Sequence, residues 1–248
     1  MKVSIITVCY NSAETIEKTF QSVKAQTYTN VEYIVIDGKS SDSTIDIIGN
    51  NKEIISKYIS EPDKGLYHAM NKGIKLATGD LVGILNSDDI FKDNYVLENI
   101  AKFHLQNNVD ASVGNIIQFN EEGKTVRMYS AKNWNPGKLK IGFMPAHPAI
   151  FFKRGLFEKY GKYHLDFVSG ADYELIVRFF LKHHISWKYS DITTTAMLRG
   201  GISSSGFGSY QLISKEIVKA LSINNIPFSP IKIKLRVFGK LFGVLKKS

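Results

Sequence analysis

Two adjacent aspartates lie just beyond an apolar run in the first half of the chain. The run covers residues 81–85, and Asn86, Ser87, Asp88 and Asp89 come immediately after it. Neighbouring carboxylates repel each other and each needs a partner, so such a pair seldom ends a buried strand for stability. The carboxyl ends of parallel strands are, however, where α/β proteins bind ligands. We therefore expect Asp88 to hold a divalent metal, Mg²⁺ or Mn²⁺, that in turn holds a diphosphate; the alternative is an acid that only faces solvent.

Two further aspartates stand where a side chain could serve chemistry or could only cap an element. Asp37 follows an apolar run and precedes Gly38, so it could hydrogen-bond a base or a ribose, or close a turn. Asp172 stands at the start of a predicted helix, where an N-cap role is the common structural explanation. His147 lies between two prolines and could be a base, a ligand or a phosphate contact, but a structural histidine is at least as consistent with the sequence.

The elements that must position these residues alternate between strand and helix over the first 90 residues. Ile16, Phe20 and Val23 recur at helical spacing after the first apolar run, and similar helical patterns follow the next two runs. The expected strands are residues 3–8, 31–36, 54–59 (as a strand or a helix end) and 81–85. This alternation predicts an α/β fold with a mostly parallel central sheet and helices on both faces.

Beyond residue 90 the pattern of strands and helices is less regular. The expected elements are a helix over 96–105, hairpin strands over 111–119 and 125–129, a loop over 132–142, a strand over 149–152, helices over 156–160 and 172–182, and a strand over 185–189. The glycine- and serine-rich residues 200–208 are a candidate lid, with an exposed linker as the alternative.

Composition and motifs exclude several functional classes. The chain has 248 residues, of which 44% are hydrophobic and 22% charged, and these values are ordinary for a globular protein. Its single cysteine, Cys9, rules out a disulfide framework and favours a reducing compartment. We find no signal-peptide pattern and no apolar run long enough to span a membrane, so we expect a cytoplasmic protein. The loop after the first strand lacks the glycine patterns of dinucleotide-binding and P-loop sites.

The C-terminal residues 231–248 contain six basic residues and no acidic one, against a net charge of +9 for the whole chain. The remainder is close to balanced, so the sequence lacks the spread-out basic face of a nucleic-acid-binding protein. On a helix, one apolar stripe would be formed by Ile231, Leu235, Phe238, Phe242 and Leu245. A basic amphipathic helix predicts peripheral binding to an anionic membrane surface. The alternatives are packing on its own domain and a dimer contact.

An ordered series of motifs resembles family 2 glycosyltransferases of the GT-A fold. The motifs, in one-letter code, are VSIITVCYN at 3–11, QTY at 26–28, EYIVIDG at 32–38, SDST at 41–44, DKGLYHAMNKG at 63–73, ATGD at 77–80 and LNSDD at 85–89. The resemblance is strong over residues 1–90, weaker but ordered to about residue 205, and absent from the tail. It implies a Rossmann-like nucleotide-binding half, a nucleotide-sugar donor and transfer with inversion.

The resemblance also implies roles for residues on the donor side. Thr7, Tyr10 and Asp37 match positions that hold the nucleoside, chiefly its base. The triplet 86–88 matches the D-x-D motif, with Asp88 at the metal-binding place and Ser87 between the two ligand-facing positions. Asn86 replaces the first aspartate, and its amide can hydrogen-bond the ribose or the donor sugar without contributing charge.

On the acceptor side, Ala171 and Asp172 match the E-D region of the family, whose aspartate is the general base. The resemblance therefore favours Asp172 as a base over Asp172 as a cap. We expect a catalytic domain over 1–210, with a nucleotide-sugar half at 1–115 and an acceptor half at 116–210. A helical extension at 211–248 would carry the basic tail.

The leading functional hypothesis is an inverting glycosyltransferase. It would move a sugar, from a UDP-sugar in the first instance, to a saccharide or lipid-linked acceptor in the synthesis of a surface polysaccharide or glycolipid. A nucleotidyltransferase could share the alternating plan and an acid-bound metal, but it would be expected to carry a basic, glycine-rich first loop, which Tyr10-Asn11-Ser12 is not. A non-catalytic protein that binds sugar nucleotides or membranes is the third hypothesis, because Asn86 and Ala171 replace acids of the family pattern.

Overall fold

The computed structural model describes residues 1–120, 124–198 and 207–233. The chain divides into two compact units, each assembled from separate stretches of sequence. The first contains Met1–Lys132, Pro145–Tyr163 and Ser186–Arg199, and the second contains Asn133–Met144, His164–Ile185 and Gly200–Ser248. The strands all belong to the first unit, which therefore carries the sheet.

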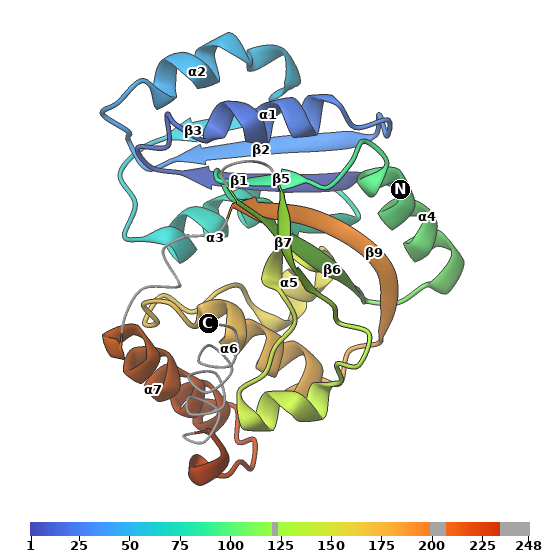
Figure 1. The fold of residues 1–248 in the computed structure, drawn as a ribbon, viewed down its shortest axis with the longest axis vertical. Coiled ribbons are helices and arrows are strands. Elements are labelled where there is room, and N and C mark those ends of the chain that lie inside the picture. The colour runs from blue at the N-terminus through green and yellow to red at the C-terminus, as the bar shows by residue number, and fades with distance from the viewer. Residues whose placement is uncertain (121–123, 199–206, 234–248) are drawn as a thin grey trace. The chain divides into compact units, whose positions relative to one another are not determined.

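One nine-stranded sheet forms the centre of the first unit (Figure 1). Its order is β3-β2-β1-β4-β8-β6-β9-β5, and β7 pairs with β6. The strands are β1 (Val3–Cys9), β2 (Val31–Asp37), β3 (Lys57–Ser60), β4 (Leu81–Ile84), β5 (Asp89–Phe91), β6 (Ala111–Phe119), β7 (Thr125–Tyr129), β8 (Ile150–Lys153) and β9 (Trp187–Leu198).

The four strands from β3 to β4 are parallel to one another. Cys9, the last residue of β1, lies opposite Asp37, the last residue of β2. The strands β5, β7 and β8, which all begin at or after residue 89, add antiparallel pairs, whereas β9 runs parallel to β6. The predicted α/β fold is confirmed, and its parallel part brings the loops after β1, β2 and β4 to one edge.

Helices cover both faces of this parallel part (Figure 1). The helices α1 (Ile16–Lys24) and α4 (Val96–Asn107) pack in one apolar cluster with Ile5. The helix α3 (Leu66–Leu76) packs on the opposite face, because a Cβ on its Gly73 would lie 2.4 Å from Cγ2 of Ile6, and neighbouring residues of a strand point to opposite faces. Two short helices, α2 (Thr44–Asn50) and α5 (Gly155–Tyr160), complete the unit.

The second unit is helical in the residues that the structure describes. It contains a 3-10 helix (Pro136–Ile141), α6 (Ala171–Val177) with a π-helical turn (Arg178–Lys182), and α7 (Phe207–Ile223). The segment 132–142, expected to be a loop, therefore holds a helix, which begins at a proline whose fixed φ suits a first helical position. The helix expected over 172–182 is confirmed, although its last turn is π rather than α.

Two strands differ from the sequence-based expectation. The segment expected over 54–59 splits into a 3-10 turn (Lys52–Ile54) and β3. The strand expected over 185–189 starts at Trp187 and continues to Leu198. Its second half contains Ile192 and three threonines, which are β-branched, and it pairs with both β6 and β5. The second half of β9 was not predicted as a strand because its composition is polar, although β-branched residues favour strands.

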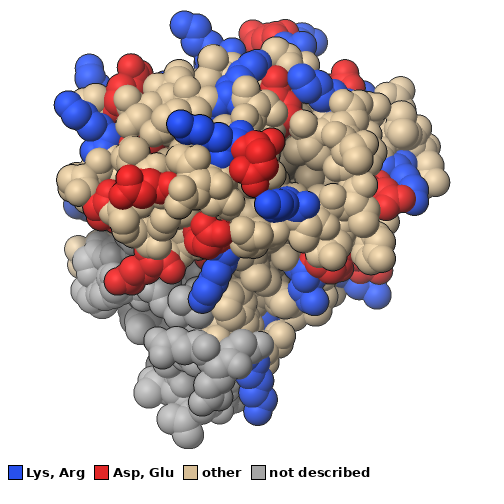
Figure 2. Space-filling view, turned by 90° about the horizontal axis from the view of Figure 1, so that it is seen from above, with Lys and Arg blue, Asp and Glu red and all other residues tan. Residues whose placement is uncertain are grey.

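Parts of two other predictions lie outside the described residues. Of the candidate lid at 200–208, residues 200–206 are not described, and Phe207 and Gly208 already belong to α7. Of the basic tail, residues 234–248 are not described, and residues 231–233 are helical. Within the described ranges, none of the helices combines the length and the hydrophobicity needed to cross a membrane. Figure 2 shows acidic and basic side chains interspersed on the face that is seen from above.

A buried carboxylate, that of Glu32 on β2, ties the parallel strands together. It accepts hydrogen bonds from Ser4 Oγ at 2.6 Å, from Thr78 N and Oγ1 at 2.7 and 2.8 Å, and from Lys2 Nζ at 3.2 Å, and it pairs with Lys57 Nζ at 2.9 Å. Burial alone would raise the pKa of Glu32, but the hydrogen bonds from Ser4, Thr78 and Lys57 outweigh it and hold this pKa well below its ordinary value.

Replacing Glu32 with glutamine is expected to lower the free energy of unfolding at pH 7 by about 1.5–3 kcal/mol, the range for a hydrogen bond to a charged group. A depressed folded-state pKa stabilises the fold above the unfolded value of about 4.3 and ceases to do so as pH falls through the folded-state value. The gap between wild type and variant should therefore shrink below about pH 4 in urea unfolding. Glu53→Gln, which breaks an exposed pair with Lys24, is the control and should leave the free energy of unfolding almost unchanged, because exposed pairs contribute little. Equal losses in the two variants would contradict the assignment.

Candidate functional site

Asp37 lies at the edge where the parallel strands end, and its side chain is fully buried. Its carboxylate accepts hydrogen bonds from Ser40 N at 3.1 Å, from Ser40 Oγ, and from Ser60 Oγ at 2.6 Å. The carboxylate thereby joins the turn after β2 to the end of β3. Asp37 thus closes a turn, as one of the two sequence-based interpretations expected.

Tyr10 provides an aromatic surface directly beside Asp37. Its side chain is 65% exposed. A Cβ on Gly38 would lie 3.3 Å from Tyr10 Cδ2, so the ring packs on the glycine backbone. Aromatic rings that are fixed from below and open above offer a flat face to another ring. Tyr10 and Asp37 therefore lie side by side and leave an open aromatic face.

The loops after β1, β2, β3 and β4 lie at the carboxyl edge of the parallel strands, and we call them the rim. Hydrogen bonds hold the loop after β1 to the loop after β2. Asn11, at a left-handed φ of 48°, accepts from Ser41 N at 2.9 Å, and its own N–H donates to Ser40 Oγ at 2.9 Å. Ser12 N donates to Thr44 Oγ1 at 2.8 Å. Asparagine is among the few residues that tolerate this conformation, so the sequence suits the turn.

The residues after β4 join the same rim. The hydroxyls of Ser87 and Ser12 are 2.9 Å apart, which links the end of β4 to the loop after β1. Asp88 is exposed. Asn86 donates from Nδ2 to Asp89 Oδ2 at 3.0 Å, whereas its Oδ1 is buried and has no hydrogen-bond partner in the described structure. A buried acceptor without a donor is costly, so the hydrogen-bonding capacity of this oxygen is unused in the described structure.

Asp89 differs from its neighbour in a way that the sequence did not indicate. Its side chain is fully buried. Burial and, to a smaller extent, the adjacent Asp88 carboxylate raise the pKa of Asp89 to about 7 against the opposing effect of hydrogen bonds with Asn86. Asp88 is therefore an exposed carboxylate, whereas Asp89 is a buried acid that supports the turn.

Thr7 takes part in this edge from inside the core. Its side chain is fully buried, its hydroxyl donates to Leu85 O at 2.8 Å, and it accepts from Tyr33 Oη at 2.9 Å. The hydroxyl is thus committed to protein partners, and Thr7 fixes the backbone just before Asn86. Its side chain does not reach the rim on which Tyr10 stands.

Asp63 is a residue of this edge that sequence reasoning did not single out. Its Oδ1 lies 2.8 Å from His68 Nδ1 and 2.8 Å from Lys72 Nζ. Its Oδ2 is buried without a partner in the described structure, and lies 3.6 Å from the point where Gly38 would carry a Cβ. The signal was present, since Asp63 follows β3 closely, much as Asp37 ends β2 and Asp88 follows β4.

Asp172 belongs to the second unit and stands in the first turn of α6. The N-cap of this helix is Gly170, so Asp172 is not the N-cap that its position suggested. From residue 171 to residue 180 every side chain is buried except that of Asp172. Its Oδ1 accepts from Tyr173 N at 2.7 Å. Asp172 is thus the one partly exposed side chain in an otherwise buried stretch of helix.

His147 has a structural role in the first unit. Its ring is buried, and its Nε2 lies 2.6 Å from Tyr163 Oη. Burial lowers the pKa of His147 to about 4, so the ring is neutral at pH 7. Of the roles left open by the sequence, the structural one agrees with these contacts.

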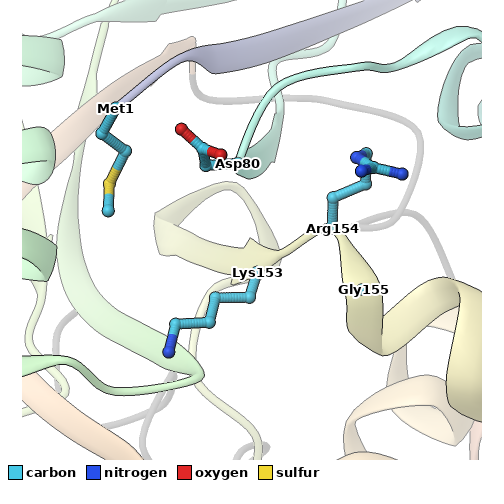
Figure 3. A pocket seen from close by; sticks show the side chains of 5 residues that line it. All are labelled: Met1, Asp80, Lys153, Arg154 and Gly155. Atoms are coloured by element: carbon cyan, nitrogen blue, oxygen red, sulfur yellow. The ribbon is translucent and has the colours of Figure 1, made fainter.

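A hollow of about 370 Å³ lies away from the rim (Figure 3). It is lined by Met1, Asp80, Lys153, Arg154 and Gly155. Asp80 accepts from Lys2 N at 2.7 Å, and these two residues directly precede β4 and β1. The hollow therefore belongs to the amino ends of the parallel strands, opposite to the edge where α/β proteins bind ligands.

The residues after β4 suit a hard cation that is completed by a ligand. Within the described ranges, no three His, Cys, Asp or Glu side chains are grouped closely enough to hold a metal. Asp88 offers an exposed carboxylate, and Asn86 offers an amide oxygen without a donor. Mg²⁺ and similar cations usually take one or two carboxylates together with ligand phosphates and water, so these residues fit a cation that arrives with a diphosphate.

Comparison with known proteins agrees with this geometry. The sequence model of glycosyl transferase family 2 matches residues 4–171. An uncharacterised glycosyltransferase of Mycobacterium tuberculosis is 33% identical over 182 residues, which cover 71% of this chain and 68% of that protein. A protein of Mycobacterium bovis named PGL/p-HBAD biosynthesis glycosyltransferase is 27% identical over 229 residues, covering 89% of this chain and 84% of that protein.

Two solved structures share the fold. TarS of S. aureus in complex with UDP-GlcNAc has a TM-score of 0.68 and 21% identity, covering 88% of this chain and 67% of that chain. A mannosyltransferase of Pyrobaculum calidifontis in complex with GDP-Man and Mn²⁺ has a TM-score of 0.61 and 17% identity, covering 98% of this chain and 80% of that chain. At these identities the likeness concerns the GT-A architecture.

Proposed function

The chain belongs to glycosyl transferase family 2 and is a glycosyltransferase, and on that premise we propose that it transfers a sugar, with inversion, from a nucleotide-sugar donor to a saccharide or lipid-linked acceptor. A UDP-sugar is the first donor to test, and GDP- and dTDP-sugars follow. The observation that carries the proposal is the rim itself, where an open aromatic face, buried acceptor oxygens and an exposed carboxylate gather at the carboxyl edge of parallel strands.

The nucleoside end of the donor would bind at the loops after β1, β2 and β3. Tyr10 would stack on the base, and Asp37 and Asp63 would accept hydrogen bonds from its N–H groups or from the ribose. Asp63 Oδ2 has no donor in the described structure, so a base N–H would satisfy it. Thr7 would contribute indirectly, by holding Leu85 and thus the start of the next loop.

The diphosphate end would bind at the loop after β4. Asp88 and Asn86 Oδ1 would hold Mg²⁺ or Mn²⁺, and the Ser87 hydroxyl would face the donor. When bound, the cation neutralises charge that develops on the departing diphosphate. Asn86 Nδ2, which donates to Asp89, keeps the amide oxygen in one orientation.

Asp172 would be the general base. Its carboxylate would accept the proton of the acceptor hydroxyl while that oxygen attacks the anomeric carbon. A single displacement from the face opposite to the leaving group inverts the configuration. The accessibility of Asp172 on a helix that is otherwise buried supports this role.

The experiment that tests the proposal follows each sugar nucleotide by proton NMR in the presence of Mg²⁺ or Mn²⁺ and an oligosaccharide or lipid-linked acceptor. Transfer from an α-linked donor should yield a β-linked product. Retention of the α configuration would refute inversion, and binding of donors without any turnover would favour the non-catalytic alternative.

We also propose that residues 231–248, within the C-terminal extension at 211–248, bind an anionic membrane and so place a cytoplasmic enzyme beside a lipid-linked acceptor. Six basic residues without an acid support this proposal, since each basic residue near an anionic surface contributes about 1 kcal/mol. Removal of residues 234–248 is expected to abolish flotation with anionic vesicles at physiological salt, while neutral vesicles bind neither form. Equal flotation of both forms would contradict the proposal.

A further inference from the structure

Glu216 of α7 is a buried carboxylate that binds the turn immediately before Asp172. Its Oε1 accepts from Val168 N at 2.6 Å, and its Oε2 accepts from Ser169 N at 3.0 Å and from Ser169 Oγ at 3.2 Å. We propose that Glu216 is a positioning residue for Asp172, and this inference rests on the proposed role of Asp172 as the base. Glu216 lies beyond residues 4–171, which the family model matches.

Gly170 makes this contact possible. It is the N-cap of α6, and a Cβ at this position would lie 3.0 Å from both Cβ and Oε2 of Glu216. Contacts at that distance are tighter than almost all that real Cβ atoms make, so a larger residue would have to displace Glu216 or the turn. The sequence therefore provides both halves of the contact, a carboxylate on α7 and an N-cap without a side chain.

The turn decides where Asp172 points. Asp172 is two residues beyond Gly170, and its neighbours Ala171 and Tyr173 are buried. The first N–H groups of a helix have no partner within the helix, so its start is fixed by contacts from outside. Glu216 binds the N–H groups of the two residues that precede the N-cap, outside the helix itself, and thereby holds the turn from which α6 begins.

A second contact, made by the residue directly after α7, offers a matched control. Asn224 Nδ2 donates to Glu174 Oε1 at 3.0 Å, and Glu174 forms a buried, bidentate ion pair with Arg178, with both N–O distances at 2.9 Å. This contact joins the carboxyl end of α7 to α6 away from the turn. Loss of Asn224 therefore disturbs the packing of the same two helices without releasing residues 168–170.

The test compares Glu216→Gln, Gly170→Ala and Asn224→Ala in the full chain. Glutamine retains the size of Glu216 but replaces one acceptor oxygen with a donor that faces other donors. A displacement of about 1 Å can cost about 100-fold in rate, so we expect kcat for transfer to fall about 10- to 100-fold in the first two variants. Donor affinity, measured by calorimetry, should remain within about twofold, and Asn224→Ala should lose thermal stability but little kcat.

A double-mutant cycle separates positioning from general damage. On the Asp172→Asn background, Glu216→Gln should cause no further loss, because the group that it positions is already inactive. The inference would be overturned if Glu216→Gln kept full kcat, or if its loss in kcat added to that of Asp172→Asn. It would also be overturned if Asn224→Ala lost as much kcat as Glu216→Gln, or if neither Glu216→Gln nor Gly170→Ala folded. Retention of full transfer by Asp172→Asn alone would instead refute the base assignment on which the inference depends.

Discussion

Replacing Asp172 with asparagine is expected to lower kcat for sugar transfer by about 10²- to 10⁴-fold, the range that a positioned general base contributes. Asparagine has nearly the same size and can still accept from Tyr173 N, so the fold and the start of α6 should be kept. The amide cannot take up the acceptor proton, which is the reason for the loss. The measurement is steady-state transfer to a true acceptor, with circular dichroism to verify the fold.

Asp166→Asn is the matched control for this prediction. Asp166 belongs to the same unit and pairs at the surface with Lys219 at 2.9 Å. Exposed pairs contribute little, so this variant should keep transfer within about threefold of wild type. Transfer by Asp172→Asn at the rate of Asp166→Asn would show that Asp172 is not the base.

Replacing Asp88 with asparagine should lower turnover of the donor by about 10²- to 10³-fold, comparable with the loss of one group that stabilises transition-state charge. In this variant, residues 86–88 would contain two amide side chains and no exposed carboxylate, so the affinity for Mg²⁺ or Mn²⁺ should fall. We expect the metal concentration needed for half-maximal activity to rise. A titration of activity against each metal measures both effects.

Glu158→Gln serves as the control for Asp88→Asn. Glu158 is an exposed acid that pairs with Arg154, and Arg154 Nε donates to Gly79 O at 3.0 Å, near the amino end of β4. The substitution removes one negative charge at the end of the sheet remote from the rim. If both variants had the same metal dependence as wild type, Asp88 would not be the metal ligand.

Much of the fold could be predicted from sequence because local patterns and tertiary packing agree over the first 90 residues. The strands that end at Cys9, Asp37 and Ile84 are short apolar runs, and each precedes a turn with polar side chains. The second half of β9 could not be predicted, because its strand character comes from pairing with β6 and β5 on either side. Local composition carries no information about partners so far away in sequence.

The candidate site was predictable in residue type but not in burial. Asp88 and Asp89 are residues of the same type, yet Asp88 is exposed whereas Asp89 is a buried acid with a raised pKa. Thr7 was expected at the nucleoside, but strand alternation turns its hydroxyl into the core toward Tyr33. The position of Asp63 just after β3 was a signal in the sequence, whereas the missing donor at its Oδ2 is visible only in the structure.

The most direct test of metal-dependent sugar transfer measures release of nucleoside diphosphate from UDP-, GDP- and dTDP-sugars by the purified chain, with Mg²⁺, with Mn²⁺ and with EDTA. We expect release from at least one donor in the presence of metal, loss of release in EDTA, and recovery when metal is restored. Asp88→Asn should reduce release, whereas Glu158→Gln should not. Full release in EDTA, or no release from any donor with either metal, would refute the proposed function.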